Sequence, residues 1–398
     1  MKRALKDSDK PKLCFVVSAP MTAVAFLNGH IDYLSGEYEV TVVCNFDGTE
    51  KDISKNASLK NIRIARNISP ISDLKAVYSL ARFLKKGDFQ ITHSVTPKAG
   101  LTTALAGWLT RIPIRIHWFT GQVWVLRSGP FRALLKNIDR LIARLNTSLL
   151  VDSLSQRDFL IAEQVVNPLK ARVLGAGSIS GVDTERFRPN AELRRKTRDE
   201  LQITDPSATI ILFVGRFNHD KGIETVLKAF RRQTLKSNTY LLLVGVDEGN
   251  YLPRIPDLLG AAIEKFRYIS FTSEPEKYMA AADIFLYPSL REGFGLSVIE
   301  AGASGLPAVA SRIYGITDAI IDGETGFLTK AGDVEEVCDR LELLTGNQQL
   351  HENMGENARL NVLKLWQSSQ LERALLEYYQ VLRLPPVGTP RKSKGKIK

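Results

Sequence analysis

The sequence has no apolar run long enough to cross a bilayer. A membrane-spanning helix needs about 20 consecutive apolar residues, and the most apolar stretch, residues 101–119, is interrupted by Arg111, Pro113 and His117. The charged segment 1–12 is followed by an apolar run of strand length only, so it lacks the pattern of a signal peptide. We therefore expect a cytoplasmic protein.

Cysteine and metal-binding motifs are equally scarce. Three cysteines, Cys14, Cys44 and Cys338, leave an odd number and no Cys-x-x-Cys pair, which indicates neither a disulfide framework nor a zinc site. Cys14 and Cys44 lie in apolar runs, where a thiol behaves as a small buried hydrophobe. The only Asp-x-Asp motif, at residues 7–9, stands in a charged amino-terminal segment. We therefore expect neither a metal nor a cofactor.

Acidic residues are outnumbered by basic ones. The chain has 54 Lys and Arg against 43 Asp and Glu, a formal net charge of +11. Such an excess favours an anionic partner: a nucleic acid, an anionic bilayer or a phosphorylated substrate. The sequence contains no basic motif interleaved with aromatic residues of the kind that binds RNA. Nucleic acid is therefore not expected among the partners.

Short apolar runs alternate with amphipathic stretches along the chain, a pattern typical of parallel βαβ units. In the first half, strands are expected at residues 13–18, 39–44, 89–93, 114–119, 148–152 and 171–174, with helices at 24–34, 72–86, 98–109 and 131–145. In the second half, strands are expected at 209–214, 239–244, 268–271, 284–287 and 308–310, with helices at 223–232, 275–282, 296–304, 335–344 and 350–382, the last broken near Trp366.

A polar stretch after Gly181 divides this alternation into two units. We predict an α/β protein with two Rossmann-like domains, residues 1–185 and 186–365, that face each other across a cleft. A helix over 366–384 that returns to the first domain and a basic, disordered tail over 385–398 complete the chain. In open sheets of this kind, ligands bind beyond the carboxyl ends of the strands.

Two polar clusters stand at such strand ends in the second unit. The first, residues 214–222 (VGRFNHDKG), follows a predicted strand and opens a helix. Arg216 and Lys221 place two cations beside the free backbone N–H groups of that helix start, which suits a diphosphate. The segment is not a Walker loop, because GxxxxGK[ST] is absent. An ordinary solvated loop is the alternative.

The second cluster, residues 288–301 (PSLREGFGLSVIEA), also links a strand to a helix. Gly293 and Gly295 remove side chains where the backbone must approach a ligand closely, and the following helix directs its positive end there. Glu292 and Glu300 bracket one extended ligand in this interpretation. Alternatively, Glu292 stabilises the helix dipole and Glu300 is a surface charge.

These clusters, together with residues 323–327 (GETGF), resemble the family 4 retaining glycosyltransferases. The resemblance covers nearly all of residues 150–330, in the family's order. In the first half, residues 96–100 (TPKAG) and 115–122 (RIHWFTGQ) are similar to bacterial members that build surface polysaccharides on polyprenyl lipid carriers. The resemblance implies the GT-B fold, in agreement with the two-domain prediction.

The resemblance also implies roles for individual residues. Arg216 and Lys221 would hold the donor diphosphate and stabilise the charge on the leaving nucleotide without a divalent metal. Glu292 would fix the sugar, and Glu300 would accept hydrogen bonds from the ribose hydroxyls. Backbone groups would supply the other donor contacts, from Gly215, Phe271, Thr272, Gly293, Phe294, Gly295 and Leu296.

In the first domain, His117 lies in a predicted strand, and a family histidine near this position lies close to the donor sugar. A packed core histidine is the alternative. Gln122, Trp124 and Arg127 follow in a loop that we assign to acceptor contact. Segment 18–23 departs from the family, because it lacks the glycine-rich turn that usually approaches the diphosphate.

The helix predicted at 131–145 carries a basic stripe, because Arg132, Lys136, Arg140 and Arg144 recur every fourth residue. The opposite face is apolar. A basic stripe over an apolar face suits an anionic membrane surface. A solvated basic face on a core-packed helix is the alternative.

The sequence thus predicts a metal-independent retaining hexosyltransferase. It would move a sugar from a nucleotide-sugar donor, expected to be a UDP-sugar, to a polyprenyl-diphosphate-linked or other glycan acceptor in bacterial surface-polysaccharide assembly. We expect it as a peripheral protein on the inner face of the cytoplasmic membrane. The alternatives are a GT-B sugar-nucleotide epimerase or phosphorylase and a non-catalytic sugar-nucleotide-binding subunit. A dinucleotide oxidoreductase is disfavoured, because no GxGxxG follows the first strand.

Overall fold

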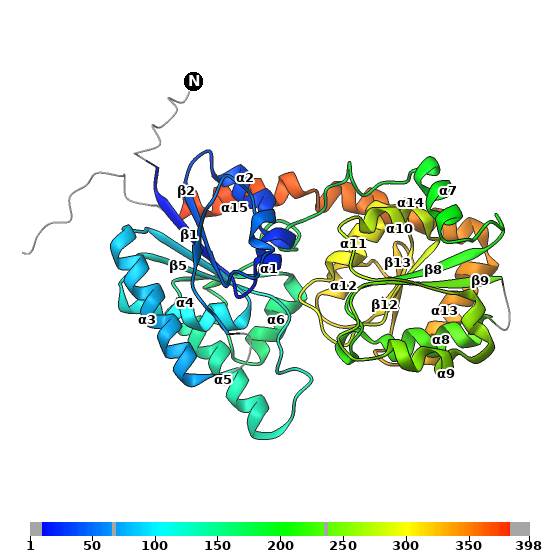
Figure 1. Ribbon diagram of the computed structural model, residues 1–398, viewed down its shortest axis with the longest axis horizontal. Coiled ribbons are helices and arrows are strands. Elements are labelled where there is room, and N and C mark those ends of the chain that lie inside the picture. The colour runs from blue at the N-terminus through cyan, green and yellow to red at the C-terminus, as the bar shows by residue number, and fades with distance from the viewer. Residues whose placement is uncertain (1–9, 66–68, 235–237, 383–398) are drawn as a thin grey trace, which may run out of the picture.

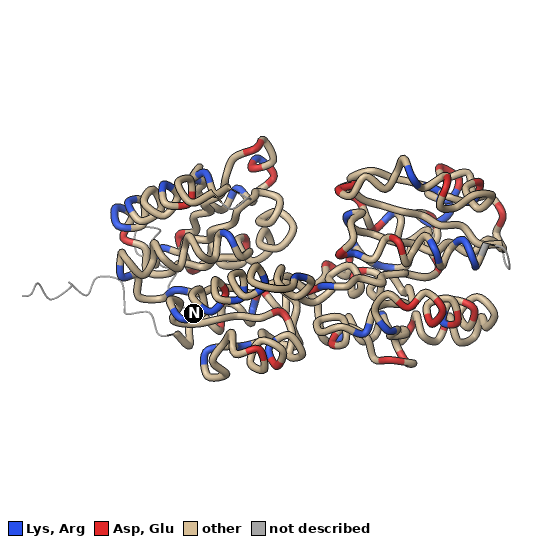
Figure 2. Tube along the Cα trace, turned by 90° about the horizontal axis from the view of Figure 1, so that it is seen from below, with Lys and Arg blue, Asp and Glu red and all other residues tan. Residues whose placement is uncertain are grey.

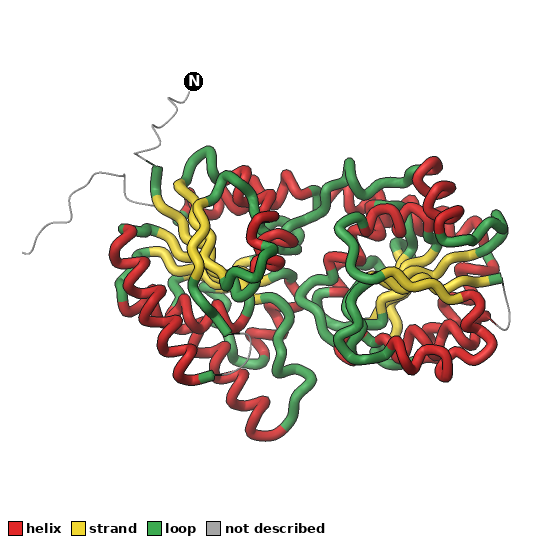
Figure 3. Tube along the Cα trace, in the orientation of Figure 1, coloured by secondary structure: helices red, strands yellow, loops and turns green. Residues whose placement is uncertain are grey.

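The computed structural model describes residues 10–65, 69–234 and 238–382. They form two domains, each built on a parallel sheet with helices on both faces (Figure 3). The predicted α/β fold class is therefore confirmed. The Asp-x-Asp at residues 7–9 and the basic tail at 385–398 lie outside the described residues.

The first sheet has the strand order β3-β2-β1-β4-β5-β6-β7. Its strands are β1 (Lys12–Val16), β2 (Glu39–Cys44), β3 (Ser58–Asn61), β4 (Ile91–Val95), β5 (Ile114–Phe119), β6 (Ser148–Val151) and β7 (Ala171–Arg172). Its helices are α1 (Pro20–Phe26), α2 (Asn28–Leu34), α3 (Pro70–Gly87), α4 (Pro97–Leu109), α5 (Gly129–Leu145) and α6 (Leu154–Ala162).

The second sheet has the order β10-β9-β8-β11-β12-β13. Its strands are β8 (Thr209–Val214), β9 (Thr239–Val244), β10 (Phe266–Ile269), β11 (Ile284–Tyr287), β12 (Ala308–Ser311) and β13 (Gly326–Thr329). Its helices are α7 (Ala191–Glu200), α8 (Ile223–Thr234), α9 (Ile255–Leu259), α10 (Pro275–Ala281), α11 (Leu296–Ala303), α12 (Ile316–Ala319), α13 (Val334–Gly346) and α14 (Gln348–Leu365). The last helix of the chain is α15 (Ser368–Val381).

The elements that the sequence did not predict are mostly polar or short. Strand β3 has all four residues exposed, so it offers no apolar alternation to detect. Helices α6 and α7 were not predicted for a similar reason, because each has few buried residues and so shows no clear apolar face in the sequence. Strand β10 ends at Ile269, earlier than expected, which places Phe271 and Thr272 in the loop that follows.

The last two helices connect the domains. In Figure 1, α14 and α15, coloured orange to red, run back from the second domain to the first. Helix α14 ends just before Trp366 and α15 begins at Ser368. Between them, Val182 N–H donates to the Trp366 carbonyl at 2.7 Å, and Ser368 N–H donates to the Val182 carbonyl at 2.9 Å. Beyond this crossing, Leu371, Leu375 and Tyr379 are buried in the core of the first domain. Helix α15 is therefore part of that domain's core.

The cysteines and the helix lengths agree with the expectations from the sequence. Cys14, Cys44 and Cys338 are free and buried, which confirms their packing role. Among the described residues, none of the helices combines the length and apolarity needed to cross a membrane. Basic and acidic positions are interspersed over both domains (Figure 2), so neither domain carries charge of one sign alone.

The packing of α15 leads to a stability prediction. Replacing Leu375 by Ala removes a fully buried side chain and should lower the free energy of unfolding by ~2–5 kcal/mol. Urea unfolding followed by circular dichroism measures this change. The exposed neighbour Gln380 provides the control, since Gln380→Ala should stay within about 0.5 kcal/mol of the parent. Equal stabilities for Leu375→Ala and the parent would contradict a core role for α15.

Candidate active site

The polar clusters of the second domain lie at its topological switch point. Strands β8 and β11 are neighbours in the sheet, although strands β9 and β10 come between them in sequence. The loops that follow these two strands, residues 215–222 and 288–295, therefore leave the same point in opposite directions. Such a point is where open α/β sheets bind ligands.

Lys221 and Glu292 are brought together there. The Lys221 ammonium forms an ion pair with Glu292 and donates to the Tyr287 hydroxyl at 2.8 Å. Glu292 Oε1 also accepts from the Tyr287 hydroxyl at 2.7 Å and from Ser289 Oγ at 2.9 Å. One carboxylate oxygen thus collects three donors from both loops and from the end of β11.

Burial and pairing act in opposite directions on this carboxylate. Burial raises the pKa of Glu292, but the Lys221 ammonium and the hydroxyls of Tyr287 and Ser289 outweigh it, so the net pKa lies below the usual value. Burial and the Glu292 charge raise the pKa of Tyr287 well above its ordinary value. Glu292 is therefore ionised and Tyr287 neutral at pH 7.

Glycines shape the loops around this pair. Gly222 adopts a φ of +69°, and a side chain there would collide with the Pro288 carbonyl, so this residue lets α8 begin against the β11 loop. Gly295 has a φ of +87° and precedes the first residue of α11, Leu296. The N-terminal N–H groups of α11 therefore open toward the same space as Lys221.

The other predicted donor residues are more dispersed. Arg216, next to Gly215, extends to Glu248 with a distance of 2.9 Å between Nη1 and the carboxylate, outside the Lys221 cluster. Glu300 lies in the second turn of α11, where burial raises its pKa to about 7 against the opposing charge of Arg186. Phe294 is buried and packs on Trp366.

Phe271 and Thr272 stand in the loop after β10. The Phe271 side chain is exposed, and Thr272 Oγ1 accepts from Glu274 N–H at 3.0 Å. Their strand, β10, is at the outer edge of the second sheet, two strands from β8. The structure thus places them at the carboxyl side of the sheet but not in contact with the Lys221 cluster.

His117 is deeply buried in β5. Its Nδ1 lies 2.9 Å from Ser94 Oγ, and its ring lies directly beneath Gly100 of α4, where any side chain would collide with it. Burial lowers the pKa of His117 to about 3, so the imidazole is neutral at pH 7. The TPKAG segment is explained by this contact, since Gly100 makes room for the ring. The proximity of His117 to a donor sugar stays a prediction.

The two domains approach each other closely at Gly293. A side chain at this position would collide with the Asp152 carboxylate and come within 2.9 Å of Gly121 N from the first domain. Arg291 Nη1 donates to the Gly121 carbonyl at 3.1 Å, while its Nη2 contacts Asp220 at 2.7 Å. Arg291 therefore ties both ligand loops of the second domain to the loop after β5.

Several of these residues were missed by sequence reasoning. Asp152 follows β6, is buried, has an Oδ1 that accepts no hydrogen bond from described residues, and has a pKa that burial raises to about 8. Tyr287 closes β11. Asp152 and Tyr287 could have been found in the sequence, because each is a polar or hydroxyl-bearing residue at the end of an apolar strand, where ligands bind in such sheets. The pairing of Arg291 with Gly121 had no sequence signal, because it crosses between domains.

The loop after β5 corrects the acceptor assignment of Gln122 and Trp124. Both side chains are buried. Gln122 Nε2 donates to the Thr120 carbonyl at 2.5 Å, and the Trp124 indole N–H donates to Asp139 Oδ2 at 2.7 Å. These residues hold the loop and α5 in place, whereas Arg127 is exposed.

Three residues of the basic stripe of α5 have partners within the first domain. Arg132 and Lys136 both bind Glu163, at 3.1 and 2.6 Å, and lie over the Trp124 ring. Arg140 donates to the carbonyls of Gln164 and Glu163. The fourth residue, Arg144, is exposed.

The predicted apolar face of α5 is divided. Phe131 and Leu134 are 47% and 51% exposed, whereas Leu135 and Ile138 pack against the core of the domain. The fully buried positions of α5 are Asp139, Ile142 and Ala143. Contact of the basic stripe with a membrane stays a prediction, and the partners of Arg132, Lys136 and Arg140 are contacts that a helical wheel does not reveal.

Asp139 leads to a pH prediction. Burial raises its pKa to about 7, well above the ~3.9 of an unfolded aspartate. The folded state therefore holds a proton that the unfolded state has lost, so this group's contribution to stability decreases as pH rises from about 4 to 7. Asp139→Asn keeps an oxygen for the Trp124 N–H but removes the titration.

Between pH 5 and 7.5, the unfolding free energy of the parent should fall by about 2 kcal/mol more than that of Asp139→Asn. Urea titrations across this range measure the difference. Asp158→Asn, at an exposed position of α6, is the matched control and should follow the parent. Parallel curves for the parent and Asp139→Asn would show that Asp139 does not titrate in this way.

Comparison with known proteins assigns each domain to a family. Residues 33–177 match the glycosyl transferase 4-like domain, and residues 194–361 match the glycosyl transferases of group 1. The first match covers most of the first sheet, and the second covers the Lys221 and Glu292 loops together with α14.

Relatives match over nearly the whole chain. A capsular polysaccharide biosynthesis glycosyltransferase, CapM of Staphylococcus aureus, is 28% identical over 368 residues, 90% of this chain and 94% of the relative. A UDP-Gal:alpha-D-GlcNAc-diphosphoundecaprenol alpha-1,3-galactosyltransferase of Escherichia coli is 24% identical over 82% of this chain and 85% of its own length.

Solved structures share the fold. Anabaena HepE in complex with UDP and glucose superposes with a TM-score of 0.78 at 17% identity, over 93% of this chain and all of that one. WaaG, a glycosyltransferase involved in lipopolysaccharide biosynthesis, has a TM-score of 0.73 at 17% identity and covers 94% of this chain. These likenesses identify the fold of this chain as GT-B. With its first domain matching one family and its second domain the other, the chain belongs to the glycosyltransferases that combine a 4-like domain with a group 1 domain.

Proposed function

We propose that this glycosyltransferase moves a hexose from a UDP-sugar to a polyprenyl-diphosphate-linked or other glycan acceptor, with retention of configuration, in the assembly of a bacterial surface polysaccharide. The observation that carries the proposal is the Lys221–Glu292 pair at the β8/β11 switch point, beside the N-terminus of α11. The names of the CapM relative and the E. coli galactosyltransferase support the acceptor, and the HepE complex with UDP supports the donor.

The donor diphosphate occupies the space beside Lys221 in this proposal. Its negative charge replaces the Glu292 carboxylate as the partner of Lys221, and Glu292 is freed to accept hydrogen bonds from sugar hydroxyls. The N–H groups at Gly295 and Leu296 supply further donors. Arg216 reaches the diphosphate after leaving Glu248, a pair exposed enough to exchange readily.

The nucleoside extends from there toward the outer strands of the sheet. Glu300 accepts hydrogen bonds from the ribose hydroxyls. Burial raises the pKa of Glu300 to about 7, and these hydrogen bonds, together with the charge of Arg186, favour its ionised form. The backbone of Phe271 and Thr272 meets the base. His117 lies on the other side of the cleft, and in this proposal it supports the donor sugar through the α4 turn that it packs beneath.

The transfer step breaks the bond between the anomeric carbon and the diphosphate oxygen, and the electron pair leaves with the diphosphate. The acceptor hydroxyl oxygen forms the new bond on the same face of the sugar, and its proton passes to the departing diphosphate. Lys221 and Arg216 stabilise the charge that develops on this leaving group. The unpartnered Oδ1 of Asp152, next to Gly293, is placed to accept a hydrogen bond from a hydroxyl of the acceptor.

The first test concerns the cations. Lys221→Ala and Arg216→Ala should each lower kcat about 100-fold, because losing one partner of a developing charge costs ~3 kcal/mol. Release of UDP in the presence of acceptor measures the rate, with UDP-glucose and UDP-galactose as first donors. Lys228→Ala removes an exposed cation from α8, the helix that follows Lys221, and should leave kcat unchanged.

A second variant separates loss of function from loss of fold. Lys221→Ala leaves Glu292 buried without its counter-ion, so the double variant Lys221→Ala/Glu292→Gln should recover the melting temperature but not the activity. Near-parental turnover in both single variants would refute the assignment of the diphosphate site.

The second test concerns metal ions. We propose that cationic side chains and the α11 N-terminus take the place of a divalent ion at the diphosphate. Activity in excess EDTA should then stay within about twofold of the untreated rate, whereas a Mg²⁺-dependent transfer would lose nearly all of it. The measurement is the rate of UDP release before and after chelation. Complete loss that Mg²⁺ or Mn²⁺ restores would contradict metal independence.

A further inference from the structure

A basic groove lies at the edge of the first domain, between the chain that runs from β3 and helix α3. It has a volume of about 960 Å³. The described residues that line it include five cations and no carboxylate. The cations are Lys60, Arg63, Lys75, Arg82 and Lys86, and the large apolar residues beside them are Ile62, Ile71, Tyr78 and Phe83.

These cations have no acidic partner among the described residues. Lys60 stacks over the Phe83 ring at 5.7 Å, and no ion pair joins any of the five to a described carboxylate. The one acidic residue of α3, Asp73, is taken by Lys98 of α4 at 2.6 Å. Five like charges around one hollow repel each other, so a bound anion would stabilise this part of the protein.

Helix α3 also exposes apolar side chains next to the groove. Ile71, Leu74 and Tyr78 are 74%, 72% and 66% exposed, and their spacing of three and four residues places them on one face. The buried face of α3 is a different one, made of Ala76, Val77, Leu80 and Leu84. Helix α3 is thus apolar on two faces, and only one of them is covered by the protein.

We propose that α3 and this groove dock the protein on an anionic bilayer. The phosphate groups of the lipid heads occupy the groove, and Ile71, Leu74 and Tyr78 enter the apolar boundary below them. Charge complementarity and exposed apolar side chains on one helix are the combination that interfacial helices use. A polyanion free in solution would bind the cations but would leave the three apolar side chains in water, so the bilayer is favoured.

The position of α3 suits a membrane-linked acceptor, and in this respect the inference rests on the proposed function. The Asp73–Lys98 ion pair ties the first turn of α3 to the first turn of α4. That turn of α4 also covers His117. The docked face therefore begins next to the carboxyl edge of the first sheet. Figure 1 shows α3 along the outer side of this domain, away from the second domain, which stays clear of the bilayer.

Vesicle sedimentation tests the docking surface directly. The probes are vesicles of phosphatidylcholine with or without one third phosphatidylglycerol, in the absence of donor and acceptor. The parent should bind the anionic vesicles, and salt should weaken binding, because salt screens exposed charges. Lys75→Gln/Arg82→Gln/Lys86→Gln should need at least tenfold more lipid for half-maximal binding. Leu74→Ser/Tyr78→Ser should weaken binding at high salt as well as at low salt.

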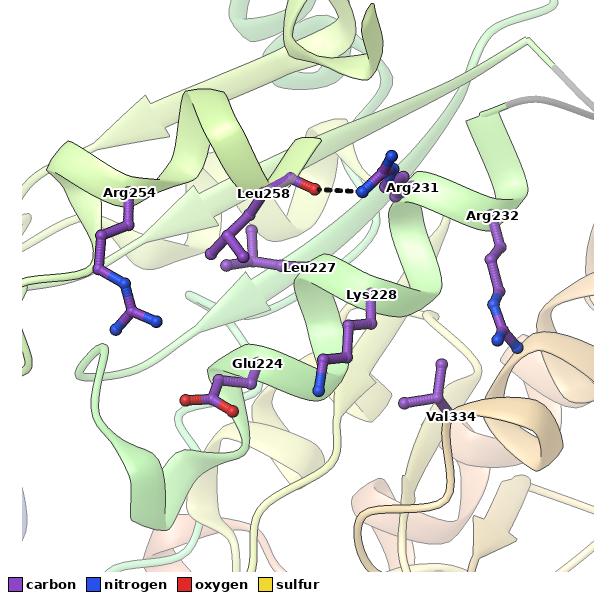
Figure 4. Close-up of a pocket in the computed structure, with 8 residues that line it drawn as sticks. All are labelled: Glu224, Leu227, Lys228, Arg231, Arg232, Arg254, Leu258 and Val334. Carbon is purple, nitrogen blue, oxygen red and sulfur yellow. Dashed lines mark hydrogen bonds between the residues drawn. The ribbon is translucent and has the colours of Figure 1, made fainter. Parts of the chain in front are cut away.

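A basic pocket in the second domain supplies the matched control. Figure 4 shows Lys228, Arg231 and Arg254 around a cavity of about 520 Å³ that also contains Glu224. Its cations point in different directions, and Arg231 turns to the Leu258 carbonyl at 3.4 Å. Lys228→Gln/Arg231→Gln/Arg254→Gln removes the same charge as the groove variant but should leave vesicle binding unchanged. All variants should keep the parental circular dichroism spectrum and melting temperature.

Three results would overturn the inference. The first is a parent that fails to sediment with anionic vesicles. The second is an equal loss of binding by both charge variants, which indicates net charge alone. The third is loss of binding by Phe131→Ser/Leu134→Ser on α5 while the α3 variants still bind. UDP release with a short water-soluble acceptor provides the separate readout of the proposed function. The α3 variants should retain it, so loss of vesicle binding with intact transfer supports the docking surface alone.

Discussion

The buried Lys221–Glu292 pair is the interaction on which the second domain's ligand loops depend. Taking either charge out of water alone would be costly, and each is stabilised by the other and by the hydroxyls of Tyr287 and Ser289. The two residues come from loops 71 residues apart in sequence, so their pairing fixes the β8 loop against the β11 loop. In the proposed function, an anionic ligand that binds Lys221 also changes the surroundings of Glu292, so recognition of the diphosphate is coupled to recognition of the sugar.

The approach of the two domains is set by backbone rather than by large side chains. Gly121, Gly293 and Gly315 allow main chains from three loops to meet, and a side chain at any of them would collide with or crowd its neighbours. Hydrogen bonds then align the contact, from Arg291 to the Gly121 carbonyl and from Gly315 N–H to Ser155 Oγ at 2.7 Å. The contact at these glycines is therefore made by backbone and a few polar side chains rather than by a large apolar interface.

The excess positive charge divides into cations with different surroundings. On α5, Arg132 and Lys136 share Glu163 and cover Trp124, so they stabilise the first domain. On α3, Lys75, Arg82 and Lys86 face a groove without a described carboxylate. Both helices show basic residues at helical spacing in the sequence. Within the described parts of the chain, only the cations of α5, and not those of α3, have an acidic residue from another segment within reach. This neighbour decides whether a cation is structural or open to a partner.

The sequence by itself determined the class of fold, the two-domain division and the two ligand loops. Strands 114–119, 209–214, 239–244 and 284–287 were predicted with the bounds that the structure has, because continuous apolar runs flanked by turn residues are a local property. The polar clusters after β8 and β11 were recognisable for the same reason.

Tertiary structure alone decided which side chains meet. It paired Lys221 with Glu292 but placed Arg216 with Glu248, buried His117 beneath Gly100, and brought Asp152 of the first domain to Gly293 of the second. It also gave Arg132 and Lys136 of α5 a shared carboxylate and left apolar residues of α3 exposed. Periodicity gives the faces of a helix but not their neighbours, because those come from segments distant in sequence whose positions depend on the packing of the whole domain.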